Sequence, residues 1–339
     1  MKKGPLISVV LPVYNCASYI EEAINSILNQ TITDFELIII DDASTDKTLT
    51  IVQNIQDSRI KIITKEQNLG LIHSLNLGFE LAKGKYIARM DGDDINLPER
   101  FEKQVAILEE KSDIKACGCW LQSFGAYNIL IEHKETHKEI QSHLLLSNPM
   151  SLGATMLDRK AYESFRFLED KIHVEDYDFW ARSAWACPMY NIQEILYYYR
   201  VHNNQVSTKY KSIQLKGDVE IKLSLYQKLQ YNRAIYSDEL ISKLLYTNNS
   251  FNIQELKLIL DWFTTLIKNN KRLKVFDYSE FKKVIFKIRR KLLFDIFFTN
   301  NGEGIDYNLR KKIFQIVPIN EKIFVLKKKI YEKFKTFFR

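Results

Sequence analysis

The chain has 339 residues, enough for one large domain or two domains of ordinary size. Its hydrophobic content of 46% and charged content of 27% are typical of a soluble globular protein and exclude a largely disordered chain. No stretch approaches about 18 consecutive apolar residues, so we expect no membrane-spanning helix, and the net charge of +7 is more informative when the chain is divided.

The cysteines and the N-terminus bear on location. The chain has four cysteines: Cys16, Cys117, Cys119 and Cys187. They have neither the spacing of a zinc site nor the density of a disulfide scaffold, so we expect buried thiols in a reducing cytoplasm. Pro12 and Asn15 end the first apolar run early, and we expect no signal peptide.

Residues 1–125 alternate between strand and helix signals. Short β-branched runs predict strands, and longer segments with apolar residues every three or four positions predict helices. We expect strands over 6–14, 35–41, 60–64, 85–90 and 114–122, and helices over 18–30, 45–56, 71–83 and 98–110. This succession predicts an α/β fold with a mostly parallel central sheet and right-handed crossovers.

Polar clusters follow three of the expected strands. They are PVYN after the first strand, DDAST after the second and DGDD after the fourth. Because the carboxyl ends of parallel strands share one edge of a sheet, we expect the clusters to meet there. Asp91, Asp93 and Asp94 would repel one another unless a cation lies between them, and hard cations prefer carboxylate oxygens. The alternative is a solvated turn or helix cap.

The chain changes character after residue 125 and again near residue 209. A loop, a charged turn entering a helix and a strand ending in a polar loop are predicted by NPMSLGATM, VEDYDFW and YYYRVHNNQVS. Beyond them the pattern is helical and rich in lysine. We expect one domain over 1–208, with halves 1–125 and 126–208, and a helical basic region over 209–339.

The two parts also differ in charge. Residues 209–339 hold 28 Lys and Arg against 13 Asp and Glu, a net charge of +15, and since the whole chain carries +7, residues 1–208 carry −8. The asymmetry indicates an acidic, cation-using front and a back that meets an anionic surface, either nucleic acid or lipid.

The ordered motifs resemble one family. SVVLPVYNCASYIEEAINSILNQT, FELIIIDDAST and NLGLIHSLNLGFELAKGKYIARMDGDD closely resemble the family-2 glycosyltransferases with a GT-A fold, and the resemblance continues more weakly through VEDYDFW to YRVHNNQVS. It implies an inverting transfer of a sugar from a nucleotide-sugar, usually with a UDP leaving group and a divalent cation. The half 1–125 would then bind the donor and the half 126–208 the acceptor.

The resemblance assigns roles at the donor end. Pro12, Val13 and Tyr14 would line the nucleotide pocket, and Asp42 would accept the N3–H of uracil. Asp42 could alternatively begin a turn that caps the next helix, with Ser44 or Thr45 as the N-cap.

The DGDD segment matches the DXD motif of the family. Asp93 would bind Mn²⁺ or Mg²⁺ directly, Asp91 would lie nearer the ribose or a metal-bound water, and Gly92 would allow close backbone approach. Oxygen ligation suits these cations, which stabilise the charge that develops on a departing diphosphate. Asp94 would support the motif from behind.

The acceptor end carries the remaining roles. In the family an acidic pair provides the base, and the resemblance assigns it to Asp176, with Glu175 and Trp180 supporting the acceptor. The alternatives are acids that favour a helix N-terminus and a core aromatic. The segment that begins with Arg200 and His202 resembles a loop that closes over the donor, where both would approach the diphosphate and His202 the metal.

The basic C-terminal region lies outside the resemblance. Its last segment places one apolar face among lysines: Ile323, Leu326, Ile330, Phe334 and Phe337. Basic amphipathic helices of this kind bind anionic membrane surfaces. The alternative is a helical subdomain whose apolar faces pack on one another.

The family resemblance and the basic C-terminal region together predict transfer of a hexose or N-acetylhexosamine from a UDP-sugar to a lipid-linked glycan, giving a β-linkage. The setting expected is lipopolysaccharide, O-antigen or capsule assembly at the inner face of the bacterial cytoplasmic membrane. A nucleotidyltransferase is the rival with similar chemistry, but LPVYNCAS is not a Gly- and Lys-rich phosphate loop. A nucleic-acid-binding protein is the rival from another class. Because interleaved base-stacking aromatics are missing, we expect no nucleic-acid partner.

Overall fold

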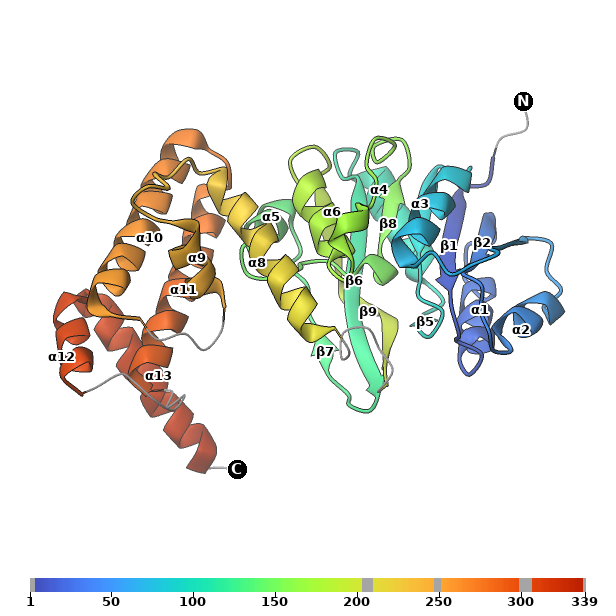
Figure 1. The fold of residues 1–339 in the computed structure, drawn as a ribbon. Helices are drawn as coiled ribbons and strands as arrows, with labels where there is room; N and C mark the ends of the chain where they lie inside the picture. The colour runs from blue at the N-terminus through green and yellow to red at the C-terminus, as the bar shows by residue number, and fades with distance from the viewer. Residues whose placement is uncertain (1–3, 203–209, 247–250, 299–306, 338–339) are drawn as a thin grey trace. The chain divides into compact units, whose positions relative to one another are not determined.

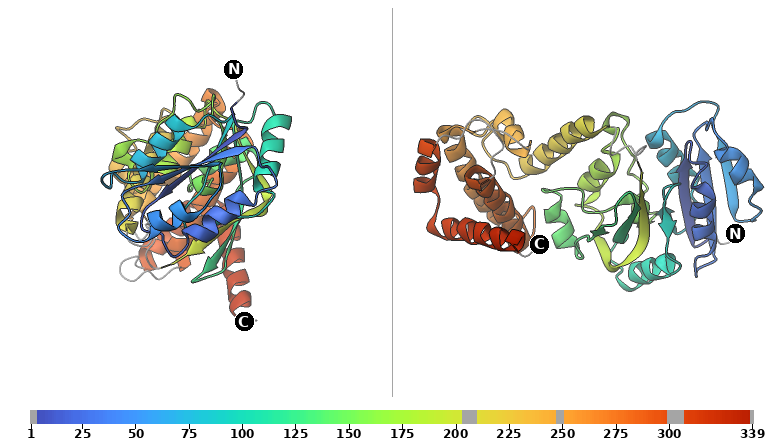
Figure 2. Two further views of the ribbon diagram at one scale, coloured as in Figure 1. Left: turned by 90° about the vertical axis from the view of Figure 1, so that its right-hand side faces the viewer. Right: turned by 90° about the horizontal axis from the view of Figure 1, so that it is seen from below.

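The computed structural model describes residues 4–202, 210–246, 251–298 and 307–337. The chain divides into two compact units, Met1–Asp218 and Val219–Arg339, which we call the N-terminal unit and the C-terminal unit (Figures 1 and 2). Within the described residues, each helix is too short or too polar to cross a membrane.

The N-terminal unit contains one nine-stranded sheet in the order β3-β2-β1-β4-β8-β6-β9-β5, with β7 paired to β6. Strands β3, β2, β1 and β4 are parallel, as are β6 and β9, while β8 joins the two sets in antiparallel pairing. The strands are β1 Ile7–Val13, β2 Phe35–Asp41, β3 Ile60–Thr64, β4 Tyr86–Arg89, β5 Ile95–Asn96, β6 Ala116–Gly125, β7 Leu130–Ile131, β8 Met156–Asp158 and β9 Met189–Val201. The predicted α/β fold with a mostly parallel central sheet is confirmed.

Helices flank this sheet (Figure 1). They are α1 Ile20–Leu28, α2 Thr48–Asn54, α3 Leu71–Leu81, α4 Arg100–Glu110, α5 His137–His143 and α6 Glu175–Ser183, with the 3-10 turns η1 Leu152–Ala154 and η2 Glu169–Lys171. Helix α8, Lys211–Gln227, crosses the boundary between the units.

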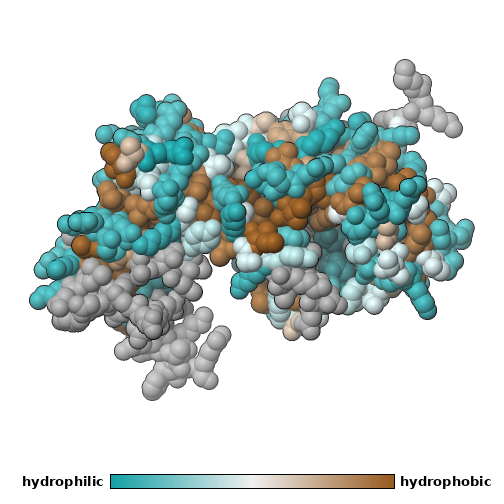
Figure 3. All heavy atoms as spheres, viewed as in Figure 1, coloured by the Kyte–Doolittle hydropathy of each residue, from teal (hydrophilic) through white to brown (hydrophobic). Residues whose placement is uncertain are grey.

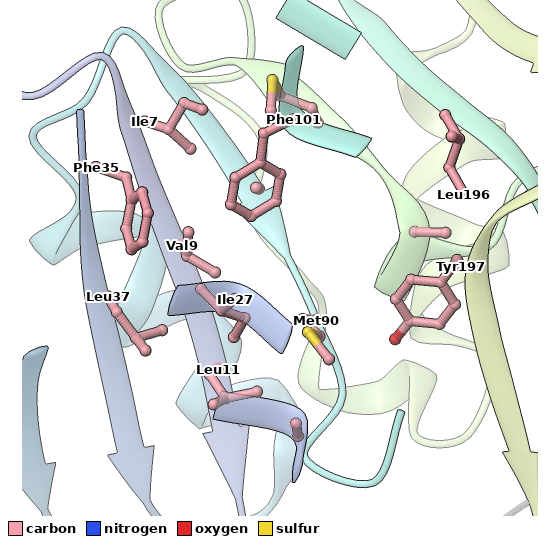
Figure 4. Packing of buried hydrophobic residues seen from close by; sticks show 14 of the residues in the cluster. Ile7, Val9, Leu11, Ile27, Phe35, Leu37, Met90, Phe101, Leu196 and Tyr197 are labelled. Atoms are coloured by element: carbon pink, nitrogen blue, oxygen red, sulfur yellow. The ribbon is translucent and has the colours of Figure 1, made fainter. Parts of the chain in front are cut away.

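The core of the N-terminal unit lies between the sheet and its helices. All seven residues of β1 and of β2 are buried, as expected for strands covered on both faces. The buried residues of α1 recur at helical spacing: Ile20, Ala23, Ile24 and Ile27. They pack with β1, β2 and the Phe101 ring in one apolar cluster (Figure 4). This packing fixes the strand ends that carry the polar clusters.

The C-terminal unit is helical, which confirms the predicted helical region. After the end of α8 come α9 Asp238–Leu245, α10 Ile253–Leu273, α11 Tyr278–Phe298, α12 Tyr307–Ile316 and α13 Ile319–Phe337. Asn252 and Glu255 form a capping box at the start of α10. A separate apolar cluster holds α10, α11, α12 and α13 together. Parts of these helices therefore pack on one another.

Candidate active site

The carboxyl ends of β1, β2 and β4 lie at one edge of the sheet. Strand β1 pairs in parallel with β2 on one side, where Val13 is opposite Asp41, and with β4 on the other. Gly92, in the turn after β4, packs against the end of β1: an added Cβ would lie 3.0 Å from Val13 Cγ1 and 3.1 Å from Cys16 Sγ. A larger residue would separate the two segments, so the glycine allows this close approach.

Asn15 joins the segments after β1 and β2. Its side-chain Oδ1 accepts the main-chain N–H of Thr45 (2.8 Å), and its main-chain N–H donates to Ser44 Oγ (3.1 Å). Ser44 and Thr45 therefore bond across the sheet edge and do not cap α2. The helix begins only at Thr48, whose amide donates to Asp46 Oδ1 (2.9 Å).

Asp42 is buried and accepts three hydrogen bonds. Lys65 Nζ and the Leu69 amide donate to its Oδ1 (2.8 and 3.0 Å), and the Gly70 amide donates to Oδ2 (2.8 Å). A carboxylate has about four acceptor directions, so these contacts leave capacity for one further donor. The three donors hold the carboxylate in one orientation at the end of β2.

The residues expected to line the nucleotide pocket lie next to Asp42. Pro12 and Val13 are buried within β1, and Val13 is opposite the last residue of β2. Tyr14 follows directly and is 48% exposed. Tyr14 thus places an accessible aromatic ring at the edge where Asp42 lies, and such a ring can stack on a base.

Asp91 pairs with Arg89, a cation whose side chain is buried. Arg89 Nη1 donates to Asp91 Oδ2, while Arg89 Nε is buried without a hydrogen-bond partner. Burial raises the pKa of the Asp91 carboxyl, and the Arg89 charge opposes that rise. Gly153 of η1 also lies against this pair, because an added Cβ would lie 2.6 Å from Asp91 Oδ2. The loop that contains NPMSLGATM therefore borders the DGDD turn.

Asp94 is a structural member of the cluster. It is almost fully buried, and it accepts the Tyr197 hydroxyl at Oδ2 and the Arg200 amide at Oδ1, both at 2.8 Å. Burial raises its pKa well above the usual range, and the charges of Asp91 and Asp93 add to the effect. Asp94 therefore attaches β9 to the DGDD turn.

Asp93 meets His202 at the end of β9. His202 Nε2 lies 3.0 Å from Asp93 Oδ2, although the two residues are 109 positions apart. Within the described part of the chain, no three His, Cys, Asp or Glu side chains form a metal cluster. One carboxylate and one imidazole still fit Mn²⁺ or Mg²⁺, because such cations are commonly held by one or two protein ligands together with substrate phosphates.

Arg200 makes several contacts at this edge of the sheet. Its Nε donates to the Asp93 carbonyl (2.7 Å), and its guanidinium lies between the rings of Tyr19 and Phe124, 4.7 and 4.4 Å from their centroids. It also pairs with Glu22. Arg200 therefore holds the backbone of Asp93, the residue that pairs with His202. Residues 203–209, the rest of the loop predicted to close, lie outside the described residues.

Asp176 stands in the first turn of α6. Its Oδ2 accepts Asn148 Nδ2 and its Oδ1 accepts the Tyr177 amide, both at 2.7 Å. Asn148 is oriented in turn by the Met150 amide, which donates to Asn148 Oδ1 (3.3 Å). Burial raises the pKa of the Asp176 carboxyl.

Glu175 and Asp176 belong to the same electrostatic cluster as the donor motif. Burial, reinforced by the Asp176 charge, raises the pKa of Glu175 to about 7. The Arg89 guanidinium lowers the pKa of both carboxyls, and the Asp91 charge raises that of Asp176. Arg89 therefore interacts electrostatically both with Asp91 of the DGDD turn and with the acidic pair of α6.

Trp180 requires a correction. It is 0% exposed, its indole N–H donates to the Met150 carbonyl (3.0 Å), and its ring packs edge-on against Phe179. No face remains for a sugar. The spacing explains this result, because Trp180 lies one helical turn after Asp176 on the inner side of α6.

Sequence reasoning did not identify Lys65, Arg89 or Asn148. Lys65 directly follows β3 at the same sheet edge, and Arg89 is a lone cation ending a buried strand, so strand-end position could have indicated both. Asn148 has no comparable signal, because its loop meets α6 only in the folded chain.

Comparisons with known proteins identify the family of the chain. Residues 8–183 match the model of the glycosyl transferase family 2. An uncharacterized glycosyltransferase of Haemophilus influenzae is 33% identical over 319 residues, covering 86% of this chain and 99% of that protein. The hyaluronan synthase of Pasteurella multocida is 28% identical over 96% of this chain but only 32% of its own length.

Solved structures share the fold. TarS 1–349 of S. aureus, in complex with UDP-GlcNAc, has a TM-score of 0.58 at 16% identity, covering 84% of this chain and 92% of that one. The mannosyltransferase PcManGT of Pyrobaculum calidifontis, in complex with GDP-Man and Mn²⁺, has a TM-score of 0.51 at 14% identity, covering 87% and 88%. The family match spans more than half of the chain, and the chain is therefore a member of glycosyltransferase family 2 and an enzyme of the transferase class.

Proposed function

We propose that this enzyme transfers a hexose or N-acetylhexosamine from a UDP-sugar, with inversion, to a lipid-linked glycan of a bacterial surface polysaccharide such as lipopolysaccharide, O-antigen or capsule. The observation that carries the proposal is that Asp42 and the Asp93–His202 pair follow β2 and β4, the two strands that flank β1, while the Asp176 carboxyl interacts electrostatically with Arg89 and Asp91 of the same sheet edge. A base-recognition group, a cation site and a general base are the parts that this reaction needs. Because the chain belongs to glycosyltransferase family 2, the nucleotidyltransferase alternative is set aside.

On the donor side, Asp42 would accept the N3–H of uracil through its remaining acceptor direction, and Tyr14 would cover the base. Asp93 and His202 would hold Mn²⁺ or Mg²⁺, which when bound supplies charge stabilisation for the departing diphosphate. The UDP-GlcNAc bound by TarS supports a UDP-sugar donor, while the GDP-Man bound by PcManGT makes GDP-sugars the comparison to test.

On the acceptor side, Asp176 would take the proton from the acceptor hydroxyl as that oxygen bonds to the anomeric carbon and the bond to the UDP oxygen breaks. A single displacement from the opposite face inverts the configuration, which gives a β-linkage from an α-linked donor. Asn148 and the Tyr177 amide hold the carboxylate in place, and Glu175 would contact the acceptor.

The acceptor also suggests where the enzyme works. We propose that it meets its lipid-linked acceptor at the inner face of the cytoplasmic membrane through peripheral contact with anionic lipid. The support is the +15 charge of residues 209–339.

The deciding experiment measures nucleotide release from UDP-, GDP- and dTDP-sugars with Mn²⁺ or with EDTA. We expect one UDP-sugar to be hydrolysed in the presence of the metal, and hydrolysis to be lost in Asp93→Ala. Asp170→Asn, which changes an exposed acid of η2, serves as the matched control and should retain the wild-type rate. The proposal would be contradicted if the protein neither bound nor hydrolysed any of these donors.

A further inference from the structure

Helix α13 uses one face to pack within the C-terminal unit. Val325 joins the apolar cluster of that unit, and Glu321 is buried against Arg289, whose Nε lies 2.9 Å from Glu321 Oε2. Burial raises the pKa of Glu321, and the charges of Arg289 and Arg290 oppose the rise. Packing therefore accounts for the inner face of α13 and for Glu321.

The opposite face of α13 is apolar and exposed. Its side chains are Ile319, Ile323, Leu326 and Ile330, with exposed fractions of 69, 48, 47 and 56%. Their spacing of four, three and four residues places them within about 60° of the helix circumference. We call these four residues the α13 stripe. Phe334 and Phe337, predicted to continue it, have side chains outside the described residues.

Lysines border the α13 stripe on both sides. At 3.6 residues per turn, Lys322 and Lys329 lie on one flank and Lys327 on the other. Among the side chains of α13 that the structure describes, the acid Glu321 points inward to Arg289. The outer face is therefore an apolar strip with cationic edges. Apolar residues also reach the surface elsewhere on both units (Figure 3), but at α13 they align along one helix.

The charge pattern distinguishes between the possible partners. A second copy of the chain docking stripe to stripe would bring the two sets of lysines together. Among the side chains of α13 that the structure describes, no acid lies beside the stripe to balance them, and like charges repel. An anionic bilayer offers an apolar layer for the isoleucines and leucine, with phosphate groups at the depth of the lysine ammonium ions. Lysine stems can extend along the helix to reach those phosphates.

We propose that α13 lies in the interfacial plane of an anionic membrane, with the α13 stripe inserted among the lipids and Lys322, Lys327 and Lys329 at the headgroups. The inference rests on the membrane placement proposed above and is independent of the donor and the base. It names the surface through which the C-terminal unit meets lipid.

The test is co-sedimentation of the full-length protein with vesicles of phosphatidylcholine alone or with 30% phosphatidylglycerol. We expect binding to the anionic vesicles that weakens as salt rises. The double substitution Ile323→Ser with Ile330→Ser should weaken binding at least about tenfold, because both apolar insertions are lost. Lys327→Ser should weaken it about fivefold on anionic vesicles only.

The matched control is Ile235→Ser, which changes an isoleucine of the C-terminal unit that is 51% exposed. It should bind vesicles like the wild type, and thermal unfolding should show that all variants are folded. Equal binding by control and stripe variants would overturn the proposal, as would absence of binding to anionic vesicles. A concentration-dependent dimer that Ile323→Ser abolishes would instead assign the stripe to a second copy. UDP release is measured in parallel, so a failed donor assignment is recognised separately.

Discussion

The two sides of the proposed site, the donor side around Asp93 and the base side around Asp176, hold their carboxylates by different means. On the donor side, the DGDD turn is attached to β9 through Tyr197, Arg200 and His202, three residues that make several contacts to Asp93 and Asp94. On the base side, Asp176 depends on its own helix N-terminus and on one amide, that of Asn148. The donor side is therefore held redundantly, whereas changes on the base side should alter the reaction and leave donor binding intact.

The largest expected effect is the loss of transfer activity in Asp176→Asn, with donor binding retained. Asp176→Asn keeps the size and polarity of the side chain but removes the proton acceptor, so transfer should fall by about 10²–10⁴-fold. Donor binding should stay within about twofold, because the contacts of Asp42 and Asp93 are untouched. Transfer rates together with calorimetric titration of UDP would measure both effects.

Asp170→Asn is the control for that substitution, since it removes a neighbouring carboxylate that is exposed. Retention of transfer within about tenfold in Asp176→Asn would contradict the assignment of the base. Loss of UDP binding in the same variant would show that the two sides are not separable.

His202→Gln tests the donor side by removing the imidazole beside Asp93. The affinity for Mn²⁺ in the presence of UDP should fall at least about tenfold, since a ligand of the cation is lost. Titration of metal into the UDP-bound protein measures this, and excess Mn²⁺ should restore turnover. His73→Gln, on α3, is the control and should keep the wild-type metal affinity. An unchanged metal affinity in His202→Gln would exclude His202 as a ligand.

Asn148→Ala tests the single amide on the base side. The hydrogen bond favours the ionised carboxylate, so its loss should raise the pKa of Asp176 further and move the acid limb of the pH–rate profile to higher pH by about one unit. The turnover number should also fall about tenfold, because the base is less well positioned, while the KM for the donor should not change.

Asn54→Ala, at the exposed end of α2, is the control for the amide. A merely structural role for Asn148 would lower stability and turnover without moving the pH profile. That result would remove Asn148 from the list of positioning residues.

The smallest effect concerns stability. Glu175 has a pKa of about 7 in the folded protein, above the usual value of 4.5, so the folded enzyme binds more protons than the unfolded chain between these two pH values. Its contribution is therefore present at low pH and is lost as pH rises through 4.5 to 7. Glu175→Gln should stabilise the protein by about 1–3 kcal/mol at pH 8 and little at pH 4.5.

Thermal midpoints at the two pH values would measure this difference, with Glu169→Gln on η2 as the exposed control. An equal change at both pH values would show that burial of the charge is not the cause. Activity should fall in the same variant, which would link the acidic pair to function at a cost in stability.

Much of the fold could be predicted because its signals are local. Residues 35–41 form a short β-branched run and became β2, buried along its whole length. Residues 18–30 carry apolar residues every three or four positions, and the helix α1 is buried on that face. The start of α2 was predicted too early, since Ser44 and Thr45 bond to Asn15, a partner some 30 positions away. Trp180 was misassigned because its burial depends on the packing of α6.

The sequence by itself determined the alternation that makes a parallel sheet, and hence the edge at which PVYN, DDAST and DGDD meet, because strand direction follows from connection length. Only the tertiary structure decided which groups these motifs meet. Tyr197 and His202 reach the DGDD turn from β9, Asn148 reaches Asp176 from a loop, and the α13 stripe stays uncovered. Such contacts form between segments far apart in the chain, and local propensity carries no information about them.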